Sequence, residues 1–290
     1  MYLKHFKLKE LPFNITSDTS FFMNRAGYQD ALNVLTVALR SGEGFVKVTG
    51  EVGVGKTILC KTLMKNVSKD FVTAYIHNPF IKADSLFFTI ADALSVQYEE
   101  GISQHKLLTL LTRALLNTHR KGKKVVVCLD EVQAMPVQTL ESLRLLTNLE
   151  TEKRKLLQVV LFGQPELDNL LSQPSVRQLK QRITFTYQLQ PLNKVATCSY
   201  IKHRLQIAGC EENLFNHRAC DAIHKYSQGI PRLINVLCHK GLMCAYGEGK
   251  RVVTHKHIKL AYHDMEQGGE DKESWLNHYF PGFSRWILGS

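Results

Sequence analysis

Apolar residues in the first two-thirds of the chain alternate between short continuous runs and segments with helical spacing. The continuous runs predict buried strands at 45–49, 71–76, 125–129, 157–162 and 183–189. Helical spacing predicts helices at 28–40, 56–68, 84–96, 104–120, 137–151 and 165–172. Strands that alternate with helices in this way are typical of an α/β domain with a parallel sheet.

After Pro191 the spacing becomes helical throughout, with predicted helices at 194–208, 215–227, 231–246 and 255–266. We therefore expect an α/β domain at residues 1–191 and an all-helical domain at 192–266. Residues 267–290 begin with a polar linker and end with an aromatic tail that holds both tryptophans. The tail has two interpretations, a docking segment for a partner or a membrane surface and a segment that folds back on its own domain.

Charge and composition narrow the class of protein. The 290 residues include 37 lysines and arginines against 26 acidic residues, which gives a net charge of +11. Such a balance favours contact with polyanions, either nucleic acid or anionic lipid headgroups, and does not choose between them. The chain has neither a signal-peptide pattern nor an apolar run of spanning length. Its seven cysteines form no C-x-x-C pair and are interpreted as reduced core thiols. We expect a cytoplasmic location.

The segment GEVGVGKT, at residues 50–57, follows the first predicted strand and opens the helix at 56–68. It fits the pattern G-x-x-x-x-G-K-[ST], whose backbone N–H groups surround the phosphates of a nucleotide. In that pattern Lys56 bridges two phosphates of ATP and the Thr57 hydroxyl binds Mg²⁺. The alternative is a glycine-rich turn with an exposed lysine. The predicted nucleotide-binding residues are Gly50, Glu51, Val52, Gly53, Val54, Gly55, Lys56, Thr57 and Ile58.

The segment VVVCLDE, at residues 125–131, combines a buried strand with two acidic residues at its end. A parallel sheet opens its ligand crevice at the carboxyl ends of the strands, so Asp130 faces the phosphates. There Asp130 can hold Mg²⁺ through water, with Thr57 as the other metal-binding residue, and Glu131 can act as the general base toward an attacking water. An Asp-Glu pair after a strand is also a common turn. Together with the phosphate loop, the pair favours hydrolysis of ATP over binding alone.

These motifs resemble those of AAA+ ATPases, a group of P-loop NTPases with a helical lid. A closer resemblance, over roughly residues 1–266, is to the ATPase domain of general secretion pathway protein A. It rests on the segments LPFNITSDTSFFMNRAGYQDALNVLTVAL, GEVGVGKT, LDEVQ, LFGQPEL, LKQRI and QGIPRLIN. The same domain type occurs in the ATPase of mannose-sensitive haemagglutinin pilus biogenesis and in transposition ATPases. Long secretion proteins add a membrane span and a peptidoglycan-binding part. This sequence ends without either, so we expect a closer resemblance to the short pilus-biogenesis type.

The resemblance implies a five-stranded parallel sheet of order 5-1-4-3-2 and roles for further residues. Gln164 matches the sensor 1 residue, although a helix-capping turn is the alternative. Arg182 matches the arginine finger that reaches the ATP of a neighbouring subunit, with Arg177 as the alternative finger. Arg232 matches the sensor 2 arginine of the lid, or is an ordinary residue at a helix start. Asn78 occupies the place of an asparagine that restrains the general base in some AAA+ proteins.

The predicted catalytic residues are therefore Lys56, Asp130, Glu131, Gln164, Arg182 and Arg232. The resemblance also puts Pro12, Phe13, Phe22 and Ile230 near the adenine, although ordinary core packing explains them equally well. An arginine finger in trans implies a ring-like homo-oligomer. The expected function is ATP-driven assembly of a pilus or a type II-like secretion machine at the cytoplasmic side of the inner membrane, with its assembly proteins as partners. The alternative is an ATP-dependent DNA-binding switch of the transposition type.

Overall fold

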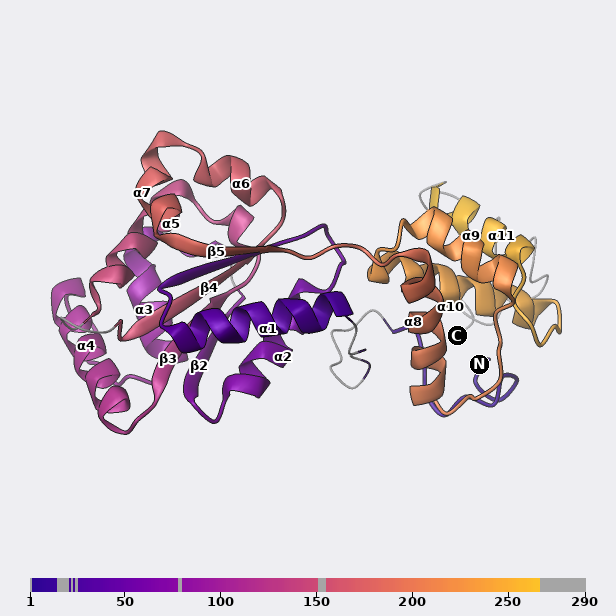
Figure 1. The fold of residues 1–290 in the computed structure, drawn as a ribbon, viewed down its shortest axis with the longest axis horizontal. Coiled ribbons are helices and arrows are strands. Elements are labelled where there is room, and N and C mark those ends of the chain that lie inside the picture. The colour runs from indigo at the N-terminus through magenta and orange to yellow at the C-terminus, as the bar shows by residue number, and fades with distance from the viewer. Residues whose placement is uncertain are drawn as a thin grey trace, which may run out of the picture. The chain divides into compact units, whose positions relative to one another are not determined.

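The computed structural model describes residues 2–14, 21, 23, 26–77, 80–150 and 155–266. They form two compact units (Figure 1). The sheet unit extends from Ala26 to Gln190, and the helical unit contains the described residues up to Met23 together with those from Pro191 to Glu266. The predictions for Phe22, Asn78 and the aromatic tail concern residues outside the described part of the chain.

The sheet unit is built on five parallel strands. They are β1 (Phe45–Thr49), β2 (Phe71–Ile76), β3 (Lys124–Leu129), β4 (Leu157–Gly163) and β5 (Ile183–Gln188). Their spatial order is β2-β3-β4-β1-β5 (Figure 1), so the predicted order 5-1-4-3-2 is confirmed. Strands β1 and β4 are buried along their whole length, as continuous apolar runs in a covered parallel sheet should be. The parallel arrangement brings the carboxyl ends of β1, β3 and β4 to one edge of the sheet.

Helices cover both faces of this sheet. On one face α1 (Ala26–Ser41) packs against α2 (Lys56–Val67). The other face is covered by α3 (Leu86–Ala93), α4 (Gln104–Arg120), α5 (Val137–Leu143), α6 (Glu166–Leu171) and α7 (Arg177–Arg182). Successive side chains of a strand point to opposite faces, and on β3 the side chains of Val125, Val127 and Leu129 enter the core beneath this second group of helices.

Three short helical elements differ from the sequence predictions. The helix predicted at 84–96 is a 3-10 turn, Ala83–Ser85, followed by α3, which ends before Ser95 adopts a positive φ of 57°. The helix predicted at 137–151 ends at Leu143 and continues as a 3-10 turn, Arg144–Asn148. Helix α7 has only six residues, too few to show helical spacing in the sequence, and was not predicted.

The helical unit contains α8 (Lys194–Ile207), α9 (His217–Ser227), α10 (Pro231–Gly247) and α11 (His255–Glu266). Asparagine caps begin two of them. The side chain of Asn193 accepts the N–H of Ala196, and that of Asn216 accepts the N–H of Ala219, each at 2.8 Å. All seven cysteines are free, and all except Cys198 are buried. Within the described part of the chain, no helix combines the length and the apolar composition needed to cross a membrane.

The N-terminal segment packs with the helical unit, whereas the predicted boundary placed it in the α/β domain. Tyr2, Phe6, Leu8 and Phe13 are buried in the same core as the helices that follow Pro191. The Tyr2 hydroxyl also bonds Nδ1 of His239 in α10 at 2.8 Å. The apolar residues between the lysines of this segment therefore complete the helical core. For Phe13, the core-packing interpretation holds.

Two neighbouring histidines at the start of α11 differ in their surroundings. His255 is exposed. His257 is buried, its Nδ1 accepts the N–H of Thr254 at 3.0 Å, and its Nε2 lies 3.1 Å from a carboxylate oxygen of Glu248. His257 is buried because the third residue of this helix faces the core, whereas the first does not. No cluster of three or more metal-binding side chains occurs among the described residues.

Candidate functional site

The loop between β1 and α2 depends on glycines at two positions. Gly55 has a φ of +103°, and a Cβ there would lie 2.1 Å from the hydroxyl oxygen of Tyr28, which itself donates to the carbonyl of Val54. A Cβ on Gly50 would lie 2.9 Å from the carbonyl oxygen of Leu189. Other residue types would therefore push the loop out of this conformation. The loop leads directly into α2, with Gly55 as the residue before its first turn. The backbone N–H groups at this N-terminus favour binding of an anion.

Lys56, the first residue of α2, points back into this loop. It is only 5% exposed, and its Nζ donates to the carbonyl oxygens of Gly50 at 2.8 Å and Glu51 at 3.1 Å. Burial lowers the pKa of Lys56 because it removes the ammonium from water, while the nearby carboxylates of Glu131 and Asp130 oppose this change. The alternative of an exposed lysine in a glycine-rich turn is therefore wrong. A buried cation in a concave loop suits an anionic ligand.

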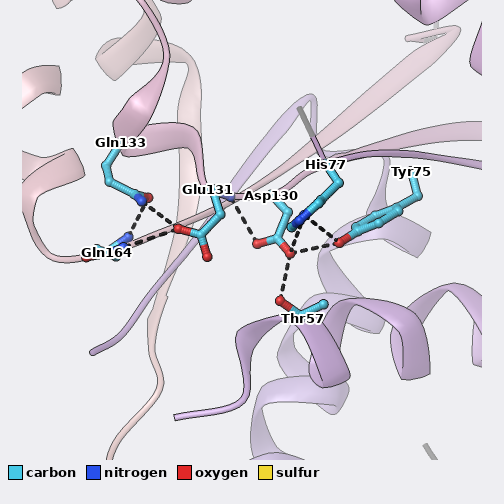
Figure 2. A network of polar contacts seen from close by, with 7 residues as sticks. All are labelled: Thr57, Tyr75, His77, Asp130, Glu131, Gln133 and Gln164. Atoms are coloured by element: carbon cyan, nitrogen blue, oxygen red, sulfur yellow. Dashed lines mark hydrogen bonds and ion pairs between the residues drawn. The ribbon is translucent and has the colours of Figure 1, made fainter. Parts of the chain in front are cut away.

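Asp130 follows β3 and is fully buried among hydrogen-bond donors (Figure 2). Its Oδ2 accepts from the hydroxyl of Thr57 at 2.8 Å and from the hydroxyl of Tyr75 at 2.9 Å, and Nδ1 of His77 lies 3.7 Å away. Its Oδ1 accepts the backbone N–H of Glu131 at 3.0 Å. A carboxylate beside a hydroxyl is the hard oxygen donor set that Mg²⁺ prefers. The residues present thus fit a Mg²⁺ site.

Tyr75 and His77 are parts of this network that the sequence analysis missed. Tyr75 lies in β2, beside Cys128 of β3, and its ring stacks on that of His77 with centroids 5.9 Å apart. Its hydroxyl also lies 3.1 Å from Nδ1 of His77. Burial and the neighbouring charge of Asp130 raise the pKa of Tyr75, so its hydroxyl remains a donor. A tyrosine near the end of the strand that pairs with β3 was the available signal.

Glu131 directly follows Asp130 and is held by two amides (Figure 2). Its Oε2 accepts from Nε2 of Gln133 at 2.6 Å and from Nε2 of Gln164 at 3.2 Å. Burial alone would raise the pKa of Glu131, but these two hydrogen bonds and the positive charge of Lys56 lower it below its ordinary value. The carboxylate is therefore ionised at neutral pH and is able to accept a proton.

The structure brings four of the predicted catalytic residues together. Lys56, Asp130, Glu131 and Gln164 lie at one edge of the sheet, at the ends of β1, β3 and β4. The predicted arginines are all exposed: Arg177 and Arg182 begin and end α7, and Arg232 lies in the first turn of α10, in the helical unit. Their contacts with a bound nucleotide remain predictions.

Comparisons of the sequence identify related proteins. Residues 39–171 match a family model described as an AAA domain. The chain is 40% identical over 275 residues to general secretion pathway protein A of Aeromonas hydrophila. That similarity covers 95% of this chain and 50% of the relative, so the chain spans about half the length of the curated relative that it matches.

Comparisons of the structure identify the fold. The chain is similar to the Aeropyrum pernix ORC2 protein, with a TM-score of 0.61, 17% identity and coverage of 84% of this chain and 71% of that one. It is also similar to the Thermotoga maritima RuvB Holliday junction branch migration motor, with a TM-score of 0.57, 18% identity and coverage of 92% and 75%. The chain therefore has the fold of P-loop AAA+ proteins, contains an AAA domain at residues 39–171, and is similar over most of its length to general secretion pathway protein A.

Proposed function

We propose that this protein is a Mg²⁺-dependent ATP hydrolase. The observation that carries the proposal is the ionised Glu131 carboxylate, held by two amides directly after the buried Asp130. A chain that only bound nucleotide would have no need of a second, oriented carboxylate at this position. The AAA domain over residues 39–171 supports the same activity.

Each residue of the site has a distinct role in this proposal. The loop and Lys56 bind the phosphates; Thr57 and Asp130 would hold Mg²⁺, which would neutralise charge on the phosphate oxygens. Glu131 accepts a proton from the attacking water, and Gln164 orients that water or senses the terminal phosphate. These groups are fixed before the reaction begins, so little reorganisation is needed in the transition state.

Completion of the site requires a second subunit in this proposal. Arg182 is exposed at the end of α7, and Arg177, at the start of the same helix, is the alternative. A guanidinium at either position is able to contact the phosphates bound by a neighbouring copy. Arg232 acts from the lid toward the phosphates of its own subunit. A finger supplied in trans leads to a ring-like homo-oligomer, because a heterologous contact that closes forms a ring.

The biological task that we propose is the assembly of an envelope machine, a pilus or a type II-like secretion system. It is supported by the 40% identity with general secretion pathway protein A, over 95% of this chain. In this proposal, hydrolysis changes the conformation of the lid, residues 192–266, and the tail, residues 267–290. That change is coupled to binding of the assembly proteins at the cytoplasmic side of the inner membrane. Affinity isolation of the Glu131→Gln form with ATP should recover those proteins, and recovery of DNA in their place would contradict this task.

The activity itself is tested by the same substitution. Glu131→Gln keeps the shape of the side chain and removes the base, so we expect ATP binding to be retained and hydrolysis to fall by at least ~100-fold. Binding is measured with a fluorescent nucleotide and turnover by release of phosphate. Undiminished turnover would refute the role of Glu131, and an inactive wild-type protein would refute the hydrolase.

A second candidate function, nucleic-acid binding, is favoured by one surface of the helical unit. We call it the basic corner; it consists of exposed cations that form no ion pair with an acidic side chain of the described chain: Lys4, Lys250, Arg251, Lys256 and Lys259. Two bonds join the N-terminal segment to residues 250–251, because His5 Nε2 contacts the carbonyl of Lys250 and Arg251 donates to the carbonyl of His5. Lys250, Arg251 and Lys256 line one surface hollow. Unpaired cations on one surface suit a row of phosphates.

This second candidate has a distinct experimental signature. Replacement of Lys250, Arg251 and Lys256 by alanine should weaken duplex DNA binding and lower its logarithmic salt slope by about 3, near one unit for each lost phosphate contact. The matched control removes three exposed lysines of the sheet unit, Lys106, Lys121 and Lys123. Equal losses in both triple variants would show that net charge, and not the basic corner, determines the binding.

A further inference from the structure

The side chain of Gln133 bridges two parts of the candidate site. It lies in the 3-10 turn Val132–Ala134, just after the two acidic residues. Its Nε2 donates to Oε2 of Glu131 at 2.6 Å, and its Oε1 accepts the backbone N–H of Gln164 at 2.9 Å (Figure 2). The carboxamide therefore connects the candidate base to the backbone that follows β4.

The chemistry of the two partners determines which way this amide points. A backbone N–H can only donate, so it must face the oxygen of the Gln133 amide. Oε2 of Glu131 lies at the other end of the amide and accepts from its nitrogen at 2.6 Å. One orientation of the amide satisfies both contacts, and the reversed orientation would satisfy neither. The bridge is thus specific for a carboxamide.

A glycine at the end of β4, Gly163, leaves space for this amide. Gly163, the last residue of that strand, lies so close that an added Cβ would be 3.3 Å from Oε1 of Gln133 and 2.7 Å from a side-chain carbon of Leu167. A larger residue at Gly163 would therefore crowd the bridge. The absence of a side chain at Gly163 leaves the space that the Gln133 carboxamide occupies.

Glu131 needs such an external restraint. Its backbone has a φ of 54°, in the left-handed region that a residue with a side chain adopts rarely, and the side chain reaches the site from a turn. Gln133 and Gln164 both donate to Oε2, which limits rotation of the carboxylate. Of the two donors, Gln133 makes the shorter bond and is itself held by the backbone.

We propose that Gln133 is a positioning residue, which holds the carboxylate of Glu131 in the orientation needed to accept a proton from water. The inference rests on the proposed role of Glu131 as base. Gln133 acts through Glu131 and through no direct contact with ATP. Its loss should therefore reduce the turnover number and leave nucleotide binding unchanged.

The substitution Gln133→Leu keeps a side chain of similar size and removes both hydrogen bonds. We expect kcat to fall by about 10- to 100-fold, the effect of a misplaced catalytic group, with KM and the affinity for a fluorescent ATP analogue within about twofold. Gln133→Glu should also fail to restore kcat, because its carboxylate cannot donate to Glu131. The matched control is Gln138→Leu, a substitution of an exposed glutamine in α5, which should leave kcat unchanged.

A double-mutant cycle separates positioning from a general structural effect. If Gln133 acts only through the base, Gln133→Leu should cause no further loss of residual turnover in a Glu131→Gln background. Two results would overturn the positioning role: a further loss of turnover that multiplies with that of Glu131→Gln, or an unchanged kcat in Gln133→Leu alone. In either case, turnover by the wild type would still support the proposed ATP hydrolysis. Absence of turnover in the wild type would instead remove both proposals together.

Discussion

The hydroxyl of Thr57, at the start of α2, donates a 2.8 Å hydrogen bond to Oδ2 of Asp130, at the end of β3. This bond joins the phosphate loop to the strand that carries the acidic pair. Asp130 is completely buried, and the charge of a buried carboxylate must be offset by donors or by a cation. The same two oxygen atoms are the candidate ligands of Mg²⁺, directly or through water.

We predict that Thr57→Val weakens the response of nucleotide binding to Mg²⁺. Valine keeps the branched shape and lacks the oxygen, so affinity for Mg²⁺ in the nucleotide complex should fall by about 10-fold or more, as for other lost metal-site contacts. Titration of Mg²⁺ against the protein with bound fluorescent nucleotide measures the change. Removal of Mg²⁺ with a chelator should weaken ATP binding in the wild type and have little effect in the variant.

The control for this prediction lies five residues further along the same helix. Thr62 donates to the carbonyl of Ile58 at 2.8 Å and has no contact with Asp130. Thr62→Val therefore removes a hydroxyl of the same type from α2 outside the site, and it should leave the Mg²⁺ titration unchanged. An equal loss in both variants would mean that the effect comes from α2 as a whole and would contradict the metal role of Thr57.

A second prediction concerns the left-handed glycine of the phosphate loop. Gly55 and Gly122 both have positive φ, +103° and +77°, but a Cβ on Gly122 would meet nothing within 4 Å. Gly122→Ala should therefore lower the free energy of unfolding by about 1 kcal/mol, through backbone strain alone. Gly55→Ala adds a clash with Tyr28 and should cost about 2–4 kcal/mol. Denaturant unfolding of both variants measures the difference. Equal losses in the free energy of unfolding would show that Tyr28 moves aside without destabilising the fold.

Much of the sheet unit follows from the sequence, because strands and motifs there are local features. The buried strands appear as continuous apolar runs, and the phosphate loop and the acidic pair stand at the ends of two of them. Parallel pairing then brings these ends to one edge. The role of Gln133 could not be read in this way, because its partner Gln164 is 31 residues distant in the sequence and is brought close only by the pairing of β3 with β4.

The N-terminal segment shows a different limit. Its apolar residues, such as Tyr2 and Phe6, are buried, as hydrophobic side chains in a folded chain are expected to be, but nothing local indicates which core they enter. They pack against helices more than 180 residues further along, and the Tyr2–His239 bond has a sequence separation of 237. A domain boundary based on continuous stretches of sequence therefore assigned this segment to the wrong core.

A third prediction uses the Tyr2–His239 pair. Burial, and to a smaller extent the charge of Lys240, lowers the pKa of His239 below its ordinary value of 6.5. The unfolded chain therefore binds more protons at this residue in the pH range just below 6.5, and stability is lost as the pH falls through that range. Burial raises the pKa of Tyr2, so the phenol donates to neutral Nδ1, a bond that protonation of the imidazole would break.

The pH dependence of unfolding checks this prediction. The thermal midpoint of the wild type should decrease between pH values of about 7 and 5, and His239→Gln should reduce that decrease because it removes the titrating group. His255→Gln is the matched control, since His255 is exposed at the start of α11. A decrease of the same size in the wild type and in His239→Gln would rule out a contribution from this pair.

The last prediction concerns the arginine finger that the proposed oligomer requires. Arg182 lies exposed at the end of α7, outside the hydrogen-bond network that joins Thr57, Asp130 and Glu131. If it acts in trans, Arg182→Ala and Glu131→Gln should each lower turnover by about 100-fold or more when assayed alone. A mixture of the two proteins should regain activity, because some interfaces then pair an intact Glu131 with an intact Arg182 from the neighbour. At equal concentrations and random assembly, about one interface in four is intact. Phosphate release from the mixture measures this recovery.

The same experiment with Arg177→Ala in place of Arg182→Ala distinguishes the two arginines. The variant of the true finger is inactive alone and regains activity on mixing, whereas the variant of the other arginine is active alone. A mixture that stays inactive with either arginine variant would place the catalytic arginine in the same subunit as the base.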